Sequence, residues 1–285
     1  MRAGEPSQTA VMVCVARALA HGAPDLGRFS DPTAFTLLPE AERLWVERTR
    51  ARDTPRNGRE RFRRAADERR AMMMVARTVA IDEALRAAAC RQVVILGAGL
   101  DGRAWRMPEL ADATVFEVDH PDSQAAKRAR VAPLPQLARE VRFVPVDFTR
   151  DELGRALGDA GHDPAQPTLW IWEGVIMYLT RAEVAATLAV IERRSAAGSR
   201  LVAYYHRRAL FLVLVGMLVK RLGEPLRSTF SVEAMRALLA QHGFRVTSDD
   251  DLPTLGARVS AQVAAATRVL RHARIAVAER VTPGS

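Results

Sequence analysis

Residues 93–103 read VVILGAGLDGR. The four apolar residues at the start favour a buried β-strand, and the glycines after them favour a tight turn that lets the backbone approach a ligand closely. Gly97, Gly99 and Gly102 satisfy the pattern G-x-G-x-x-G, which follows the first strand of nucleotide-binding sheets. The stretch therefore predicts a nucleotide site at the end of a strand, and the kind of nucleotide decides the function.

Further short apolar runs follow this one, and each of them ends in a small or polar residue. They lie at 93–97, 114–119, 141–147, 168–173 and 200–206. Stretches with helical periodicity, such as 121–131 and 181–198, separate the runs, so the repeating unit is strand, crossover helix, strand. The pattern predicts an α/β fold in which a mostly parallel sheet carries helices on both faces.

The two ends of the chain depart from this alternation. Residues 1–90 have the spacing of apolar residues that is typical of helices, and residues 242–250 and 274–281 favour two more strands, the last one antiparallel and inserted beside the others. We therefore expect seven strands. We also expect four parts: a helical N-terminal region at 1–90, a nucleotide-binding core at 91–206, a helical cap or insert at 207–241, and strands that complete the sheet at 242–285.

Composition limits the other classes of function. The chain of 285 residues has a net charge of +9, but its basic residues are nearly all arginines, a bias that codon composition explains as well as nucleic-acid binding does. Cys14 and Cys90 cannot supply a disulfide framework or a zinc site, so no metal is expected. No signal peptide and no membrane span is predicted. We expect a cytoplasmic protein, monomeric or homodimeric, that binds neither nucleic acid nor membrane.

The acid in the glycine turn indicates which nucleotide the turn binds. A dinucleotide pyrophosphate needs free N–H groups at a helix N-terminus, but Asp101 would repel it and Pro108 ends the following helix early. S-adenosylmethionine has no phosphate and carries a sulfonium and an ammonium group, so an acidic turn suits it. Asp119 ends the second strand, where an acid can bind ribose hydroxyls, and Glu117 lies two residues earlier on the same face.

Six stretches of the chain resemble, in order, those of one enzyme family. They are ARTVAID (76–82), VVILGAGLDGRAWRM (93–107), VFEVDHP (115–121), VPVDF (144–148), PTLWIWEGVIMYL (167–179) and GEPLRSTF (223–230). They resemble the leucine carboxyl methyltransferase-like family of class I S-adenosylmethionine-dependent methyltransferases, whose bacterial branch includes polyketide O-methyltransferases such as that of tetracenomycin synthesis. The resemblance implies a Rossmann-like, seven-stranded sheet with helical N-terminal additions.

The resemblance also implies a role in cofactor binding for several residues. Arg77 would pair with the cofactor's carboxylate, which a guanidinium binds through two N–H groups. Gly97 and Gly99 would let the backbone approach the methionine part, and Asp119 would accept hydrogen bonds from both ribose hydroxyls. Glu173 would face the cofactor's amino group.

Two further residues would bind the adenine, and one residue departs from the family pattern. Asp147 would accept a hydrogen bond from the adenine amino group, and Phe148 would pack on the ring. The family usually has Ser or Thr after the acid of the glycine turn, where this chain has Gly102.

The acceptor is predicted less closely than the cofactor. A carboxylate is ionised at neutral pH and needs no base, whereas a phenol or alcohol needs one, for which the candidates are His206, Tyr204 and Tyr178. An anionic acceptor could be bound by arginines near the expected cap, which are Arg207, Arg208 and Arg227.

The leading hypothesis is an O-methyltransferase that acts on a polyketide or another small natural product, at a carboxylate. The alternatives are methylation of a phenol or hydroxyl group and methylation of a protein C-terminal carboxylate. An NAD-dependent oxidoreductase and a nucleic-acid-binding protein remain as alternatives of a different class.

Overall fold

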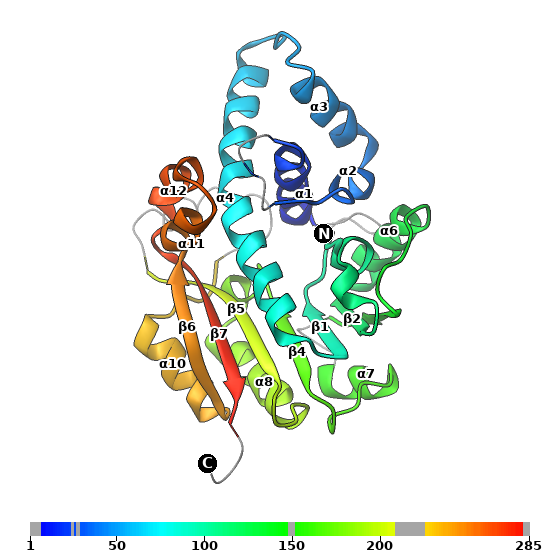
Figure 1. The fold of residues 1–285 in the computed structure, drawn as a ribbon, viewed down its shortest axis with the longest axis vertical. Helices are drawn as coiled ribbons and strands as arrows, with labels where there is room; N and C mark the ends of the chain where they lie inside the picture. The colour runs from blue at the N-terminus through cyan, green and yellow to red at the C-terminus, as the bar shows by residue number, and fades with distance from the viewer. Residues whose placement is uncertain (1–6, 24–25, 27–28, 148–151, 209–225, 282–285) are drawn as a thin grey trace.

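A seven-stranded sheet forms the centre of the protein in this computed structural model, which describes residues 7–23, 26, 29–147, 152–208 and 226–281 (Figure 1). The strand order is β3-β2-β1-β4-β5-β7-β6. Strand β7 runs antiparallel to β5 and to β6, and the other strands are parallel, which confirms the predicted sheet with one antiparallel strand. The strands are β1 (Gln92–Leu96), β2 (Thr114–Asp119), β3 (Glu140–Pro145), β4 (Thr168–Trp172), β5 (Arg200–His206), β6 (Phe244–Asp251) and β7 (Ala273–Arg280).

Helices cover both faces of the sheet, because the central strands are apolar on both sides. One face packs against α4 (Gly58–Ala88), α5 (Arg103–Arg106) and α6 (Pro121–Val131). The other face packs against α7 (Leu153–Asp159), α8 (Arg181–Arg193) and α10 (Val232–Gln241). Figure 1 shows α4 crossing the first face, with α8 and α10 behind the sheet.

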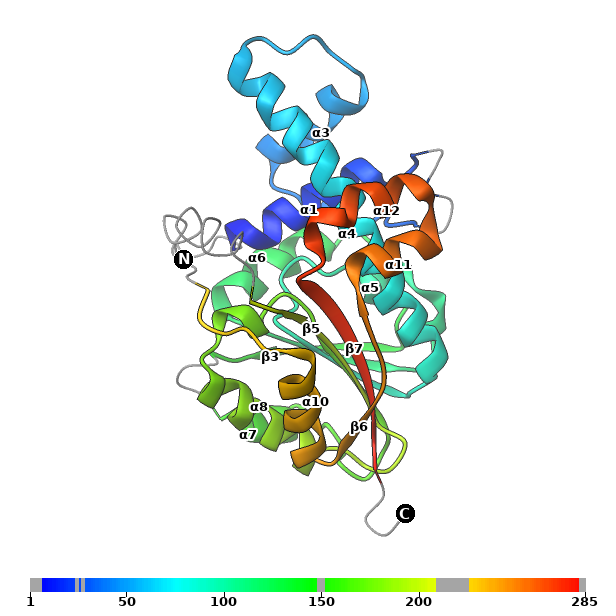
Figure 2. The same ribbon diagram turned by 90° about the vertical axis from the view of Figure 1, so that its left-hand side faces the viewer.

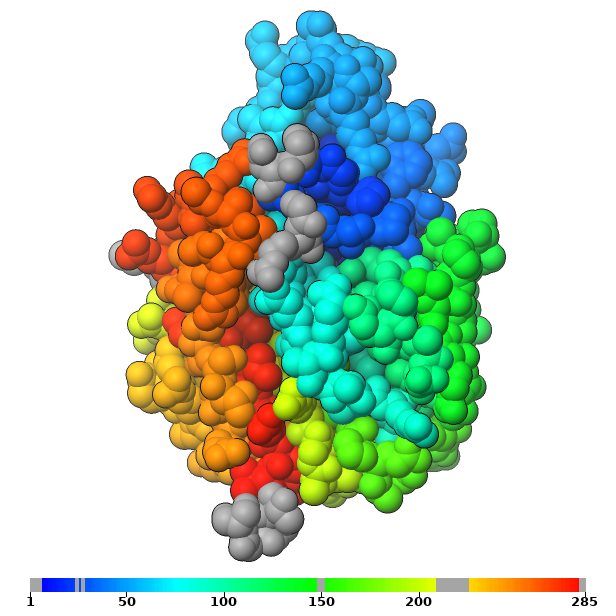
Figure 3. All heavy atoms as spheres, in the orientation of Figure 1, coloured from blue at the N-terminus to red at the C-terminus, as the bar shows by residue number. Residues whose placement is uncertain are grey.

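The N-terminal region is helical, as predicted, and it lies beyond the end of the sheet to which the parallel strands point (Figure 2). It consists of α1 (Gln8–Ala20), α2 (Ala34–Leu37), α3 (Glu40–Arg50) and the first half of α4. The side chain of Ser7 caps α1, and that of Asn57 caps α4. Helix α4 has 31 residues, so its second half lies on the sheet while its first half projects with α3, as the tip in Figure 3 shows.

The segment between the last two strands contains helices that the sequence did not predict. These are α11 (Leu252–Val259) and α12 (Ala261–Thr267), which pack against α4. Short 3-10 turns lie at Pro108–Leu110, Ile176–Tyr178 and Arg268–Leu270.

Part of the expected cap falls outside the described residues, which omit 209–225. The last part of the expected cap forms α10 (Val232–Gln241), which packs on the sheet through Met235 and Leu239. Within the described ranges, no helix is both long and apolar enough to cross a membrane.

Candidate functional site

A cavity of about 450 Å³ opens at the carboxyl ends of β1, β2 and β4. This is the point where the chain changes direction across the sheet, with β2 on one side of β1 and β4 on the other, and ligands of open α/β sheets bind at such points. Helix α1 covers the cavity. The residues that line it are Ser7, Thr9, Ala10, Val13, Arg17, Arg77, Ile95, Gly97, Ala98, Gly99, Leu100, Asp101, Asp119, His120, Ser123, Val146, Asp147, Glu173, Gly174, Val175, Met177, Tyr178, Leu179 and Arg227.

The glycine turn after β1 forms one wall of this cavity. Gly97 and Gly99 have φ values of 69° and 46°, which side chains rarely tolerate. A Cβ atom at Gly97 would lie 2.2 Å from Cγ2 of Val175, in the loop after β4. A Cβ atom at Gly99 would lie 3.1 Å from Cβ of Ala10, on α1. These two glycines therefore let the turn fit between α1 and the loop after β4.

The structure supplies a physical reason for glycine at position 102, where the family usually has Ser or Thr. A Cβ atom at Gly102 would lie 1.9 Å from Oγ1 of Thr33. Thr33 cannot move away freely, because its hydroxyl donates a hydrogen bond of 2.7 Å to Asp31. The N-terminal region thus occupies the space that a side chain at position 102 would need.

Asp101 is buried in the turn and is neutralised by its neighbour Arg103. Its carboxylate accepts a 2.8 Å hydrogen bond from the backbone N–H of Arg103 and forms an ion pair with the guanidinium of the same residue. Burial opposes ionisation, but Arg103, together with Lys127 and Arg17, holds the pKa of Asp101 well below its usual range. The first N–H of α5 is therefore taken by the protein's own carboxylate, and α5 has only four residues.

Asp119 lies at the end of β2, with its carboxylate at the cavity wall. One carboxylate oxygen accepts a hydrogen bond from the N–H of Gly99, and the other accepts a 2.6 Å hydrogen bond from the N–H of His120. Burial raises the pKa of Asp119, and these two N–H groups partly oppose that rise. The two bonds fix the plane of the carboxylate, which retains further lone pairs for a ligand.

Glu173 follows β4 and pairs with two arginines. Its Oε1 lies 2.6 Å from Nε of Arg77, on α4, and its Oε2 lies 3.0 Å from Nη1 of Arg103. Burial would raise the pKa of Glu173, but Arg77 and Arg103 lower it, so the carboxylate is ionised at neutral pH. The structure thus brings Arg77 and Glu173 together in one ion pair at the cavity wall.

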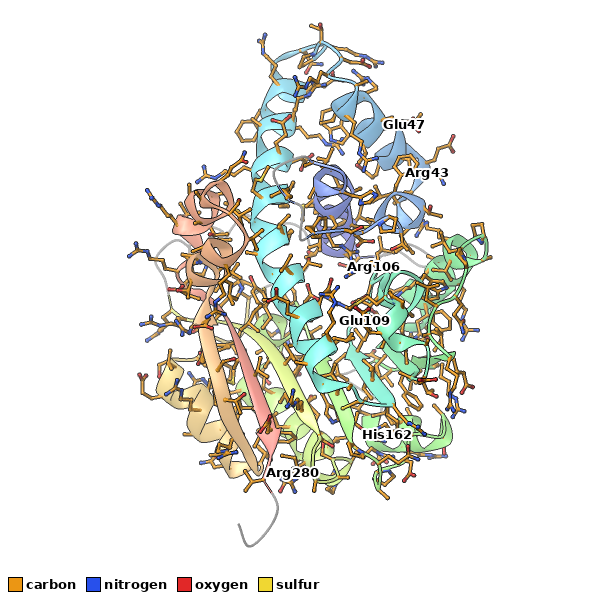
Figure 4. All side chains as sticks on the ribbon, in the orientation of Figure 1. Arg43, Glu47, Arg106, Glu109, His162 and Arg280 are labelled. Atoms are coloured by element: carbon orange, nitrogen blue, oxygen red, sulfur yellow. The ribbon has the colours of Figure 1, made fainter. Side chains whose placement is uncertain are left out.

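This ion pair belongs to a larger buried network at the junction between the N-terminal helices and the sheet. Arg103 also pairs with Asp82 of α4 at 2.8 Å, and Arg106 pairs with the same carboxylate at 2.7 Å. Figure 4 shows Arg106 at this junction, while the labelled His162 lies near the opposite end of the sheet. Among the described residues, no cluster of three or more His, Cys, Asp or Glu side chains could hold a metal ion.

Three of the predicted site residues lie behind the cavity wall. Glu117 is fully buried, and its carboxylate lies 2.6 Å from Nζ of Lys127. The guanidinium carbon of Arg77 lies over the ring of Tyr204, 5.0 Å from the ring centroid. The ring of His206 packs edge-on against that of Tyr204. Within the described part of the chain, neither ring nitrogen of His206 has a hydrogen-bond partner.

Neither of these two aromatic residues is an effective general base. Burial, followed by the neighbouring His272 and Arg77, lowers the pKa of His206 to about 3. Burial also raises the pKa of Tyr204. At neutral pH the imidazole is therefore uncharged and weakly basic, and the phenol keeps its proton.

The remaining predicted residues are divided between the cavity and its surroundings. Asp147, Tyr178 and Arg227 line the cavity. Arg207 and Arg208 are exposed and do not line it. Phe148 lies outside the described residues.

Sequence reasoning did not assign any residue of α1 to the site. Arg17 of this helix lines the cavity, donates a 2.6 Å hydrogen bond to the carbonyl of Leu100 in the glycine turn, and pairs with Asp31 at 3.2 Å. The available signal was a single arginine within the apolar run 10–20. A charge in such a run requires a buried partner.

The chain is similar in sequence to proteins of one enzyme family. A family model described as leucine carboxyl methyltransferase matches residues 10–192. A protein of Frankia alni, provisionally named an S-adenosyl-L-methionine-dependent methyltransferase, is 44% identical over 135 residues, which cover 46% of this chain and 47% of that protein. A Streptomyces coelicolor protein with the same provisional name is 37% identical over 196 residues, which cover 68% of this chain and 66% of that protein. The chain spans about half the length of most of the curated relatives that it matches first.

Solved structures with low sequence identity share the fold. A DUF574 family protein from Streptomyces avermitilis superposes with a TM-score of 0.61 at 14% identity, covering 96% of this chain and 98% of that chain. A provisionally named methyltransferase from Thermobifida fusca superposes with a TM-score of 0.54 at 15% identity, covering 98% of this chain and 96% of that chain. The Rossmann-like methyltransferase fold that the sequence predicted is therefore confirmed.

Proposed function

Because the chain belongs to the leucine carboxyl methyltransferase family, we propose that it transfers a methyl group from S-adenosylmethionine to an oxygen atom of a small-molecule acceptor. The observation that carries the proposal is the set of charged groups around the cavity at the strand ends. Asp119, Glu173 and Arg77 line one cavity whose glycine turn is closed to phosphate by the buried carboxylate of Asp101.

The chemistry of these groups fits S-adenosylmethionine. The carboxylate of Asp119, fixed by two backbone N–H groups, is an acceptor suited to vicinal ribose hydroxyls. Glu173 offers a negative charge for an amino group, and Arg77 offers a guanidinium for a carboxylate. Asp147 lies in the cavity beyond β3, where it would accept a hydrogen bond from the adenine amino group. The cofactor would supply an electrophilic methyl group on a positively charged sulfur.

A dinucleotide does not fit the same turn. Its pyrophosphate would require free N–H groups at the start of α5, but the carboxylate of Asp101 accepts the N–H of Arg103 there. The low pKa of Asp101 also keeps its carboxylate ionised and paired with Arg103 at neutral pH, so this N–H stays occupied. These two observations favour a cofactor without phosphate over NAD.

The protein's own part in methyl transfer is mainly alignment. Alignment of two reactants can supply roughly 7–11 kcal/mol of a reaction barrier. Helix α1 lines the cavity on one side, and the loop after β4 lines the other side. This loop is held by Arg227, whose backbone N–H donates a 2.7 Å hydrogen bond to the carbonyl of Met177.

The acceptor that this cavity favours is an apolar or aromatic carboxylate from natural-product metabolism, such as a polyketide. Val13, Val175 and Leu179 give the cavity apolar walls, and the side chain of Arg227 adds a positive charge. A carboxylate needs no base, and His206, one of the predicted candidate bases, has a lowered pKa and lies behind the wall. A phenolic acceptor, activated through Tyr178, and a protein C-terminal carboxylate are the alternatives.

A panel of acceptors tests this proposal. The purified protein, supplied with methyl-labelled S-adenosylmethionine, is offered aromatic carboxylates and the matched phenols that lack the carboxyl group. We expect the carboxylates to react at least about a hundredfold faster, since a phenol requires general-base catalysis of that order. The labelled product should release methanol in mild alkali, as an ester does.

The control for the acceptor is a pair of arginine variants. Arg227→Met should raise the KM for the carboxylate, whereas Arg208→Met, outside the cavity, should leave it unchanged. Label that resists alkali would contradict the carboxylate assignment and indicate a methyl ether. Absence of transfer to every acceptor, together with absence of cofactor binding, would contradict the proposed activity itself.

A further inference from the structure

Lys127 is an unusual residue in this sequence. Lysine occurs only twice among the 42 basic residues, at positions 127 and 220, and all the others are arginines. The compositional bias toward arginine does not account for Lys127, whose side chain is only 1% exposed. A fully buried lysine is rare in any protein, because its ammonium loses its hydration.

The surroundings of Lys127 show how its charge is accommodated. The residue lies on α6, and its Nζ is 2.6 Å from Oε2 of Glu117 on β2, whose side chain is also 1% exposed. The ammonium lies 5.3 Å from the ring centroid of Trp105, on α5. The ion pair is thus enclosed between the sheet and the helices that cover it, directly behind the cavity.

The position of this ammonium links it to the carboxylates of the cofactor site. Glu117 and Asp119 are two residues apart on one strand, so they share a face of the sheet. Lys127 lowers the pKa of Asp101 and of Asp119, against the burial that raises both. Burial also raises the pKa of Glu117, and Lys127 is the first group to oppose that rise.

An arginine could not take the place of this lysine. The guanidinium is planar and has five N–H donors, whereas the ammonium is a compact charge with three. The enclosed space offers Lys127 one carboxylate and one aromatic face. Several guanidinium donors would be left buried without acceptors, which is costly.

We propose that Lys127 is a positioning residue of the cofactor site: its buried ammonium, held by Glu117, keeps Asp101 and Asp119 negatively charged beneath the cofactor. This inference rests on the proposed function, because Asp119 is the group that would accept the ribose hydroxyls. Lys127 would act through Asp119 and would not touch the cofactor.

Other charged groups line the same cavity as Asp119 or lie beside it on β2, so any pH effect must be separated from theirs. They are Arg17 on α1, Asp101 in the glycine turn, Glu117 on β2, His120 after β2 and Asp147 after β3.

The test compares three variants: Lys127→Met, Glu117→Gln and the double variant Lys127→Met/Glu117→Gln. The dissociation constant of S-adenosylhomocysteine is measured by calorimetry across the pH range in which each variant is folded. In the wild type, affinity should fall as the pH falls through the pKa of Asp119. Without the ammonium this pKa rises. The acid limb, which is the low-pH part of the curve of affinity against pH, should therefore move upward by about one pH unit in Lys127→Met. On that limb the affinity should be up to about tenfold weaker.

Glu117→Gln is the matched control, because it breaks the same buried pair but keeps the ammonium. Its acid limb should stay where it is in the wild type or move downward, because Glu117→Gln removes a neighbouring carboxylate and does not remove the cation. The double variant removes both charges and leaves no unpaired ion, so it should fold even if Lys127→Met does not. Its acid limb should move upward, as in Lys127→Met.

The outcomes separate the two proposals. If the wild type binds S-adenosylhomocysteine and the acid limb stays in place in Lys127→Met and in the double variant, the proposal for Lys127 is wrong. The proposed function then stands. If Glu117→Gln shifts the acid limb upward as Lys127→Met does, the pair is merely structural, and the proposal is again overturned. If the wild type fails to bind S-adenosylhomocysteine, both proposals fail.

Discussion

Replacement of Asp119 by alanine is expected to weaken the binding of S-adenosylhomocysteine by about a hundredfold or more. A hydrogen bond to a charged acceptor contributes about 1.5–3 kcal/mol, and Asp119 would accept two from the ribose. The loss of at least about 3 kcal/mol corresponds to a factor of more than a hundred in the dissociation constant. Isothermal titration calorimetry at neutral pH measures this change directly.

Two further variants make the Asp119 result specific. Asp119→Asn keeps the shape of the side chain and one acceptor oxygen, so it should give an intermediate loss. Asp122→Ala removes a partly exposed carboxylate in the first turn of α6 and should leave the dissociation constant unchanged. If Asp119→Ala bound as tightly as Asp122→Ala does, Asp119 could not be the ribose acceptor.

Replacement of Arg77 by methionine is expected to reduce both cofactor affinity and stability. The variant removes the guanidinium that would bind the cofactor's carboxylate, and it leaves Glu173 with Arg103 as its remaining partner at 3.0 Å. Loss of one partner of a buried ion pair costs about 3–5 kcal/mol, and the remaining arginine favours the lower end of that range. Urea denaturation measures the stability, and calorimetry measures the affinity, which should fall by about a hundredfold.

The double variant Arg77→Met/Glu173→Gln distinguishes the two effects. It removes the stranded charge of Glu173, so much of the stability should return, while the affinity should stay low. Arg86→Met is the control on the same helix, since Arg86 forms an exposed pair with Glu109, and such pairs contribute about 0–1 kcal/mol. An Arg77→Met protein of full affinity would show that Arg77 has only a structural role.

The sheet could be predicted closely because its signals are local. Strands β2 and β5 begin and end at the residues that the apolar runs indicated, and the antiparallel position of β7 followed from the break in the strand–helix alternation. Helices α11 and α12 were missed. Their segment contains Pro253 and Gly256, and its packing partner is the distant helix α4.

From the sequence, the cavity could be predicted only where the ends of strands form its wall. Asp119 and Glu173 come directly at or after strand ends, so the direction of the strands places them at the same edge of the sheet. Periodicity also placed Glu117 on the same face as Asp119. It could not show that α6 covers that position and provides Lys127, because this depends on how a helix packs on the sheet.

Contacts made by the N-terminal helices were beyond the reach of sequence reasoning. The space that excludes a side chain at Gly102 is occupied by Thr33, nearly seventy residues away in the chain. The pairing of Arg77 with Glu173 likewise joins α4 to the end of β4. Such contacts depend on the tertiary arrangement, and no local pattern encodes them.

The most direct test of the account is a crystal structure of the protein with S-adenosylhomocysteine. The account predicts the nucleoside in the cavity between α1 and the glycine turn, with both ribose hydroxyls on the carboxylate of Asp119 and the amino acid end between Arg77 and Glu173. An empty cavity at a saturating concentration, or a ligand bound elsewhere on the sheet, would contradict it.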